Sequence, residues 1–244
     1  MIEKILITKT GKKFYVKDIE QDFHTQFGYV AAAELKKAKP GTAVKTNTGK
    51  ELLVLEPQFI DLYSKIARGP QIIAPKDIGT IIVETGVNKK SVIIDAGGGS
   101  GALTFFLAGI CKKVITYEIR KDFVEILEKN KKFLSAKNVR IKNENIYSGI
   151  KEKNVDMITL DLPEPWNVIP HAEKSLKPGG FLVSYSPNIP QVSDFVTAIQ
   201  KSNVFVHLKT KEVIERKWEI EERKVRPFTQ MLGHTGFLTF CRKA

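Results

Sequence analysis

The chain has 244 residues, 42% of them hydrophobic, with a formal net charge of +12 and a pI near 9.5. This length and apolar content are enough for one large domain, or for a domain with a smaller companion. The excess of positive charge favours a polyanionic partner, most often RNA or DNA, although the lysine-rich composition of heat-adapted proteins gives the same excess.

The sequence also lacks the features of several protein classes. Its two cysteines, Cys111 and Cys241, form no CxxC motif, so we expect neither a disulfide framework nor a metal site. No apolar run has the length of a membrane span, and the N-terminus has no signal-peptide pattern, so we expect a cytoplasmic protein without a membrane partner. No internal repeat or low-complexity tract is evident.

Hairpin patterns dominate the first 56 residues. Runs of β-prone residues flank Thr10-Gly11 and, further on, the stretch 47–50, and each pair of runs predicts a β-hairpin. We therefore expect a small β-domain over residues 1–56, either a nucleic-acid platform or an oligomerisation module. Residues 57–76 predict a linker helix with a proline-rich connector, and residues 77–244 predict a larger domain.

Strand-like and helix-like runs alternate in the larger domain. This alternation is typical of an α/β fold with a parallel, doubly wound sheet, in which ligands bind at the carboxyl ends of the strands. The stretch 209–240 then predicts two long strands in a terminal hairpin, one of them antiparallel to the sheet. Four polar residues fall at the predicted strand ends: Asp95, Glu118, Asn145 and Asp161.

A glycine-rich turn joins the first strand of this domain to a helix, in the run Asp95-Ala96-Gly97-Gly98-Gly99-Ser100-Gly101. Glycines let the backbone pass close to a bound ligand. The spacing fits an S-adenosylmethionine loop better than a dinucleotide loop, whose third glycine would fall at Ala102; alanine is sometimes accepted there, so a dinucleotide stays open. Glu118 can accept both ribose hydroxyls of either nucleoside.

The run Asp161-Leu162-Pro163-Glu164-Pro165-Trp166 follows the fourth predicted strand. In a nucleic-acid methyltransferase, the target base meets the methyl donor here. An aspartate near the adenine amino group could accept a hydrogen bond, stabilise the positive charge left by N1 methylation and take the amino proton. Trp166 would offer an aromatic surface near the base or the core. The alternative is that Asp161 is an ordinary turn residue.

Six segments together carry a resemblance to a known family: 23–28, 68–73, 95–104, 117–120, 161–166 and 233–236. The chain resembles the archaeal-type TrmI family of tRNA (adenine-N1)-methyltransferases over essentially its whole length. The resemblance implies a Rossmann-like class I methyltransferase fold, with a seven-stranded, mostly parallel sheet and a small N-terminal β-domain. It also implies a homotetramer, S-adenosylmethionine as the donor, and a T-loop adenine of tRNA as the acceptor, at position 58 and in some archaeal members also 57.

The resemblance also implies roles for individual residues. Asp161 would be the catalytic carboxylate. The cofactor would contact Gln71, Asp95, Gly97, Gly99, Ser100, Gly101, Ala102, Glu118, Asn145 and Asp161. We expect RNA or substrate contacts from residues that flank this site, although each could instead be a solvated charge or a structural side chain. These are Arg68, Lys76, Trp166, Arg226 and His234.

Two positions depart from the family pattern. Asn145 stands where many relatives have an acid, so the grip on the adenine ring would differ, and Ala74 stands where some archaeal relatives carry a tyrosine, which favours methylation at a single position. Two other functions stay open: a class I methyltransferase acting on another RNA or on a protein, and a non-catalytic RNA-binding subunit. The intact glycine loop, Glu118 and Asp161 argue against the second.

Overall fold

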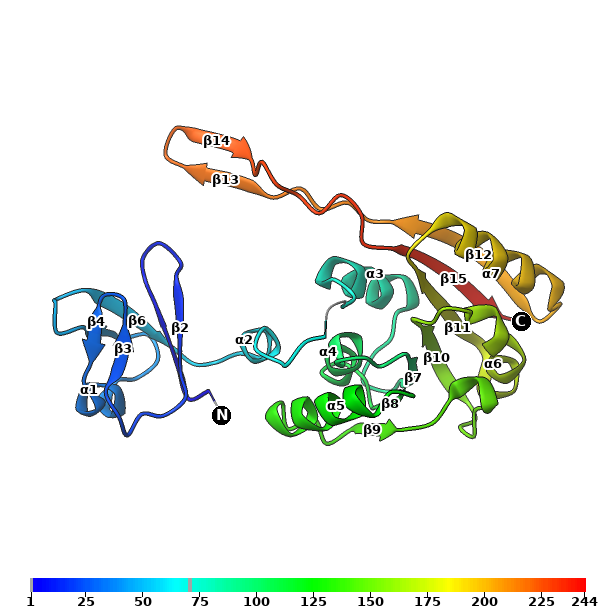
Figure 1. The fold of residues 1–244 in the computed structure, drawn as a ribbon, viewed down its shortest axis with the longest axis horizontal. Coiled ribbons are helices and arrows are strands. Elements are labelled where there is room, and N and C mark those ends of the chain that lie inside the picture. The colour runs from blue at the N-terminus through cyan, green and yellow to red at the C-terminus, as the bar shows by residue number, and fades with distance from the viewer. Residues whose placement is uncertain (1, 70–71) are drawn as a thin grey trace. The chain divides into compact units, whose positions relative to one another are not determined.

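The computed structural model describes residues 2–69 and 72–244, and the chain divides into two compact units, Met1–Ile66 and Ala67–Ala244. Each unit has its own buried apolar core. Figure 1 traces the elements of both units along the chain. None of the described helices is both long enough and apolar enough to cross a membrane.

The first unit is built on a four-stranded antiparallel sheet in the order β2-β1-β6-β5. Its core consists of alternate strand residues, such as Leu6, Leu52 and Val54, which face one side because successive strand side chains point to opposite faces. Its elements are β1 (Lys4–Ile7), β2 (Lys13–Val16), β3 (Phe23–Thr25), β4 (Gly28–Val30), α1 (Ala32–Lys37), β5 (Ala43–Lys45), β6 (Glu51–Leu55) and α2 (Phe59–Tyr63).

The short helix α2 belongs to this first unit, whereas the sequence predicts a linker over residues 57–76. The reason is a set of long-range contacts. The Lys13 ammonium forms an ion pair of 2.7 Å with the buried Asp61 carboxylate, and the Lys65 ammonium lies 4.1 Å from the centre of the Tyr15 ring. A helix of five residues is too short to be stable without such contacts.

The second unit is built on a seven-stranded sheet in the order β12-β15-β11-β10-β7-β8-β9. The five strands from β11 to β9 are parallel, and β15 is antiparallel to both of its neighbours. This confirms the predicted α/β fold with a mostly parallel seven-stranded sheet. The elements are α3 (Pro75–Thr85), β7 (Val92–Ala96), α4 (Ala102–Ala108), β8 (Lys113–Tyr117), α5 (Lys121–Phe133), β9 (Val139–Lys142), η1 (Ile146–Ser148), β10 (Val155–Leu160), η2 (Pro165–Val168), α6 (Ile169–Ser175), β11 (Leu176–Ser186), α7 (Ile189–Lys201), β12 (Phe205–Glu212), β13 (Trp218–Glu221), β14 (Lys224–Pro227) and β15 (Phe237–Lys243).

Helices cover both faces of this sheet. Val114 lies beside Val139 in the β8–β9 register, and Val139 packs with Phe105 of α4 and Leu127 of α5. The next residue, Ile115, points to the other face and joins the core under α6 and α7. The sheet is therefore doubly wound, which leaves the carboxyl ends of its parallel strands as the open edge where a ligand can bind.

The terminal hairpin is interrupted, in contrast to the two continuous strands expected over residues 209–240. Strands β12 and β15 pair within the main sheet, and β13 and β14 form a separate two-stranded ribbon between them in sequence. Figure 1 shows this ribbon projecting beyond the end of the sheet. The break follows β12 directly, where the carbonyl of Val213 accepts a hydrogen bond of 2.6 Å from the Lys76 ammonium.

Candidate functional site

The glycine loop between β7 and α4 forms the centre of the site. The N–H groups of Gly97 and Gly98 both donate to the Tyr117 carbonyl, at 3.0 and 3.1 Å, and so tie the loop to the end of β8. A Cβ atom on Gly97 would lie 2.1 Å from the Asp161 carbonyl oxygen, so only glycine lets this loop approach the end of β10. A Cβ on Gly99 would instead meet nothing closer than 3.9 Å, so this part of the loop borders open space.

The Glu118 carboxylate holds the loop from the other side. One oxygen accepts the Gly99 N–H at 2.8 Å, and the other accepts the Arg120 N–H at 2.9 Å at the start of α5. The residue is 7% exposed. Each carboxylate oxygen keeps a further lone pair, so Glu118 can fix the loop and still accept hydroxyl donors from a ligand.

Asp95 is a second buried acid at this edge. Its carboxylate accepts hydrogen bonds from the Thr104 and Thr159 hydroxyl groups, at 2.5 and 2.8 Å. Burial raises the pKa of Asp95 above its ordinary value, against the opposing effect of the two hydroxyl groups. Asp95 therefore links β7 to α4 and β10, and it lines the wall of the first pocket.

Asp161, directly after β10, is a third acid of the site, and its pKa is raised. Its backbone N–H donates to the Ala96 carbonyl at 2.9 Å, and the residue is exposed to the pocket. The protein around its carboxyl group replaces much of its hydration, and this desolvation, followed by repulsion from Asp95 and Glu118, raises its pKa to about 7. A carboxyl group with this pKa can accept or hold a proton near neutral pH.

Two pockets meet at Gly97. The first is lined by Ile72, Ile73, Asp95, Gly97, Gly98, Gly99, Ser100, Ala102, Leu103 and Asp161. The second is lined by Gly97, Tyr117, Glu118, Ile119, Glu144, Asn145, Ile146, Tyr147, Leu162 and Pro163. The first therefore carries acids and exposed backbone, and the second offers apolar walls with polar groups at its rim. Together they suit an elongated ligand that has a polar end and a flat ring.

The buried hydroxyl of Ser100 supports this interpretation. Ser100 is 3% exposed and lines the first pocket, and its Oγ atom has no hydrogen-bond partner among the described residues. A buried hydroxyl without a partner destabilises the protein, and a ligand group in the pocket would supply the missing partner.

Comparison with known proteins identifies the family. A family model described as "tRNA methyltransferase complex GCD14 subunit" matches residues 61–226. A protein of Methanocaldococcus jannaschii, named tRNA (adenine(57)-N(1)/adenine(58)-N(1))-methyltransferase TrmI, is 35% identical over 98% of this chain and 94% of its own length. This chain belongs to the TrmI family. The family inferred from the sequence motifs is thereby confirmed.

Solved structures agree with the TrmI-family fold. A SAM-dependent O-methyltransferase from Thermotoga maritima has a TM-score of 0.88 at 31% identity, covering 100% of this chain and 93% of that one. The tRNA (m1A58) methyltransferase TrmI from Aquifex aeolicus has a TM-score of 0.83 at 26% identity, covering 99% and 96%.

The structure brings most of the predicted cofactor residues of this TrmI-family chain into the two adjoining pockets. Gly101 lies at the start of α4 in a left-handed conformation, and Asn145 is the N-cap of η1, where its side chain accepts the Tyr147 N–H at 3.0 Å. Gln71 lies outside the described residues. Sequence reasoning missed the apolar walls, notably Ile119 and Leu162, each of which directly follows a strand-end acid.

Lys76 is not available to RNA, in contrast to the prediction. Its ammonium group donates to the Asp77 carboxylate at 2.8 Å, the Val213 carbonyl at 2.6 Å and the Thr235 hydroxyl at 2.6 Å. These three bonds use every N–H of the group, and its side chain is only 11% exposed. Lys76 therefore ties the start of α3 to the C-terminal segment, and a role in phosphate binding is not supported.

His234 also has internal partners. Its Nδ1 lies 2.6 Å from a Glu212 carboxylate oxygen and its Nε2 lies 2.8 Å from the Pro187 carbonyl. Both partners are acceptors, so the imidazole satisfies both only when it carries two protons, and the hydrogen bond to Glu212 raises the His234 pKa. The arrangement pins the 233–236 loop to the ends of β11 and β12, which is the alternative to RNA contact that the sequence left open.

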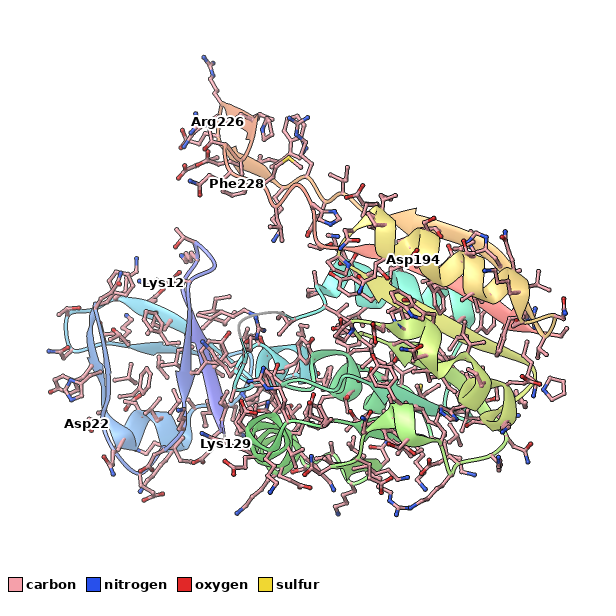
Figure 2. The ribbon with its side chains drawn as sticks, turned by 45° about the vertical axis from the view of Figure 1, so that its right-hand side comes forward. Lys12, Asp22, Lys129, Asp194, Arg226 and Phe228 are labelled. Atoms are coloured by element: carbon pink, nitrogen blue, oxygen red, sulfur yellow. The ribbon has the colours of Figure 1, made fainter. Side chains whose placement is uncertain are left out.

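The other predicted RNA contacts are spread over the second unit. Trp166 is half-buried against the main core, beside the site rather than free on the surface. Arg226 lies on the projecting ribbon, where its Nε donates to Glu219 at 3.0 Å, and Figure 2 labels it together with Phe228. Arg68 is exposed. The structure thus leaves Arg68 and Arg226 as exposed cations, and their role in RNA binding stays a prediction.

The raised pKa of Asp161 predicts a pH-dependent effect on stability. An aspartate has a pKa of about 3.9 when unfolded, so the folded protein binds this proton more tightly, and stability falls as pH rises from about 4 to about 7. Asp161→Asn removes the charge and should raise the melting temperature at pH 8 by a few degrees. The difference from the unaltered protein should shrink towards zero near pH 4, as measured by thermal unfolding without ligand.

Asp122→Asn is the matched control, because the hydrogen bond from Arg120 lowers the Asp122 pKa. This change should leave the melting temperature at pH 8 unaltered or slightly lower. Equal stabilisation by both substitutions would contradict the inference that Asp161 is specifically perturbed.

Proposed function

We propose that this protein transfers a methyl group from S-adenosylmethionine to N1 of the adenine at position 58 in the T-loop of tRNA. The observation that carries the proposal is the Asp161 carboxyl group, with a pKa of about 7, at the end of β10 beside the Gly97 loop where the two pockets meet. Membership of the TrmI family, and the names of the M. jannaschii and A. aeolicus relatives, support the same reaction.

The residues of the two pockets fit S-adenosylmethionine. In the first pocket, Ser100 Oγ and the open backbone at Gly99 would hold the amino-acid end. In the second, Glu118 would accept the ribose hydroxyls, and the apolar walls at Ile119 and Leu162 would contact the adenine ring, with Asn145 at its edge. S-adenosylmethionine supplies an activated methyl group on a positively charged sulfur, which suits the acids of the first pocket.

Asp161 would act on the target base. When ionised, its carboxylate can accept a hydrogen bond from the adenine amino group and orient N1 toward the methyl donor. It also stabilises the positive charge that forms on the ring as N1 gains a methyl group, and it can then take up the amino proton. The low hydration that raises its pKa also strengthens this electrostatic interaction.

The acceptor is tRNA in this proposal because the chain carries a net charge of +12 and its relatives are named for tRNA. We also propose a cytoplasmic location, where tRNA substrate is found. Ala74, at the N-cap of α3, supports methylation at position 58 alone, whereas the M. jannaschii relative is named for positions 57 and 58.

The proposed function predicts 1-methyladenosine in the T-loop of an unmodified tRNA transcript. Nucleoside mass spectrometry with position mapping should find it at 58 after incubation with the protein and S-adenosylmethionine. Asp161→Ala should reduce turnover by a factor of about 10² or more, because it removes the charge-stabilising group, while S-adenosylmethionine affinity changes only a few-fold. Methyl transfer to a different atom or acceptor would overturn the proposal.

The pH–rate profile gives a separate prediction. If Asp161 acts as the ionised form, kcat/KM for S-adenosylmethionine should fall about tenfold per pH unit below pH about 7 and level off above it. Initial rates measured from pH 5.5 to 8.5 at constant ionic strength would show this break. In Asp161→Ala, the residual rate should lack the break, and a break that persists there would assign the ionisation to another group.

We also propose that the chain assembles as a homotetramer, with the projecting ribbon buried between copies. The supporting observation is a row of exposed large apolar side chains on this segment: Ile214, Trp218, Ile220, Val225, Phe228, Met231 and Leu232. Ile220 and Val225 lie opposite each other in the β13–β14 register and are 75% and 58% exposed. An exposed apolar surface of this kind marks an interaction site.

Charges placed on the ribbon should therefore break the assembly. Sedimentation velocity should find a tetramer for the unaltered protein and smaller species for Ile220→Lys/Val225→Lys. Val83→Lys is the control, because Val83 is 80% exposed on α3, away from the ribbon in sequence. A monomeric unaltered protein, or a tetramer that survives the double substitution, would refute this arrangement.

A further inference from the structure

Two turns of the N-terminal unit have nearly the same sequence and the same hydrogen bonds. They are Thr8-Lys9-Thr10-Gly11-Lys12 and Thr46-Asn47-Thr48-Gly49-Lys50. In each, the glycine N–H donates to the first threonine carbonyl (2.9 and 2.8 Å), and the lysine N–H donates to the first threonine hydroxyl (3.0 and 3.1 Å). This short repeat corrects the expectation that the sequence contains none.

Both turns lie at the same end of the four-stranded sheet. Strand β6 is antiparallel to β1, and Ile7 at the end of β1 lies opposite Leu53 near the start of β6. The turn that follows β1 and the turn that precedes β6 are therefore neighbours. Figure 2 labels Lys12 on the first of them.

A third turn, between β3 and β4, is fixed beside the other two. The Thr48 hydroxyl donates to the Phe27 carbonyl at 2.6 Å, and the Asn47 side chain accepts the Tyr29 N–H at 2.9 Å. On the other side, the Lys12 ammonium donates to the Gln26 side chain. A Cβ on Gly28 would lie 2.1 Å from the Asn47 side-chain oxygen, so this close packing requires glycine. These hydrogen bonds join the three turns into one continuous surface.

Phe27 lies between the two repeated lysines. The Lys12 and Lys50 ammonium groups are 5.9 and 5.4 Å from the centre of its ring, and Lys12 is also 5.7 Å from the ring of Phe14. Both lysines are exposed, and Phe27 is half-buried. Each ammonium group thus lies beside the same ring, where cation–π attraction stabilises it without neutralising its charge.

No aspartate or glutamate among the described residues forms an ion pair with Lys12 or Lys50. The stretches 8–13, 23–30 and 45–50 include five lysines and no aspartate or glutamate, and of these lysines Lys13 pairs with Asp61 of α2. The adjacent Glu51 lies 3.6 Å from Lys45, on β5. Two ammonium groups beside one ring, neither of them paired with a carboxylate, suit an external polyanion such as the successive phosphates of a nucleic acid strand.

We propose that Lys12 and Lys50, with Phe27 between them, form a phosphate-binding clamp for the tRNA backbone. The inference rests on the proposed function, because it takes tRNA as the polyanion, and it assigns a substrate-binding role to the N-terminal unit. The clamp contacts backbone and not bases, since an ammonium group is a point charge that recognises phosphate without sequence preference. It therefore positions the substrate and takes no part in the methyl transfer.

The test is a double substitution, Lys12→Gln/Lys50→Gln, in the full chain. Binding of unmodified tRNA transcript should weaken about tenfold or more at moderate salt, and the slope of log K against log salt should decrease by about 1 to 2. The KM for tRNA should rise while kcat at saturating tRNA stays unchanged. S-adenosylmethionine affinity should also stay unchanged, which shows that the second unit is intact.

Lys37→Gln/Lys39→Gln is the matched control, because both lysines are exposed in the same unit and the net charge changes equally. It should alter tRNA affinity and salt slope much less. Equal loss in both variants would show a general charge effect and overturn the clamp. If tRNA binds tightly and Lys12→Gln/Lys50→Gln leaves binding unchanged, the clamp alone is refuted; if the unaltered protein neither binds nor methylates tRNA, the proposed function fails with it.

Discussion

The close approach of the Gly97 backbone to the Asp161 carbonyl is the constraint on which the site depends. It exists because β7 and β10 are adjacent parallel strands that end together, with Leu160 beside Ala96 in register. The contact fixes the position at which the glycine loop leaves the sheet. It therefore also fixes the position at which the two pockets join. It also brings the acids of three strands to one edge, although like charges repel.

Desolvation, together with that repulsion, gives the site its chemistry. Asp95 is held by two threonine hydroxyls and Glu118 by two backbone N–H groups, whereas Asp161 opens onto the pocket. The two supported acids stabilise the loop, and their repulsion adds to desolvation, the larger cause, in raising the pKa of Asp161. The same residues therefore serve folding and function, at a cost in stability of the kind often found at active sites.

The sequence was informative where local pattern decides structure. The strand-end acids, the glycine loop and the βα alternation depend on neighbours within a few residues, and the structure contains each of them. Lys76 and His234 show the limit, because their partners Val213 and Pro187 are far away in sequence, and no local pattern distinguishes a buried ammonium from a solvated one. The repeated turns are hard to recognise in the sequence because a motif of five residues carries little statistical weight, although its hydrogen bonds are specific.

The order of the last strands has a consequence for how the chain is made. Strand β12 pairs with β15, and β15 lies between β12 and β11 in the finished sheet. During synthesis β12 emerges first, and the whole β13–β14 ribbon follows before its partner exists. The edge of β12 therefore stays unpaired until β15 is synthesised, and unpaired strand edges with apolar side chains aggregate readily. Two lysines of β12, Lys209 and Lys211, form ion pairs with Glu84 of α3. Because α3 is synthesised before β12, these ion pairs can hold β12 in place before β15 is available.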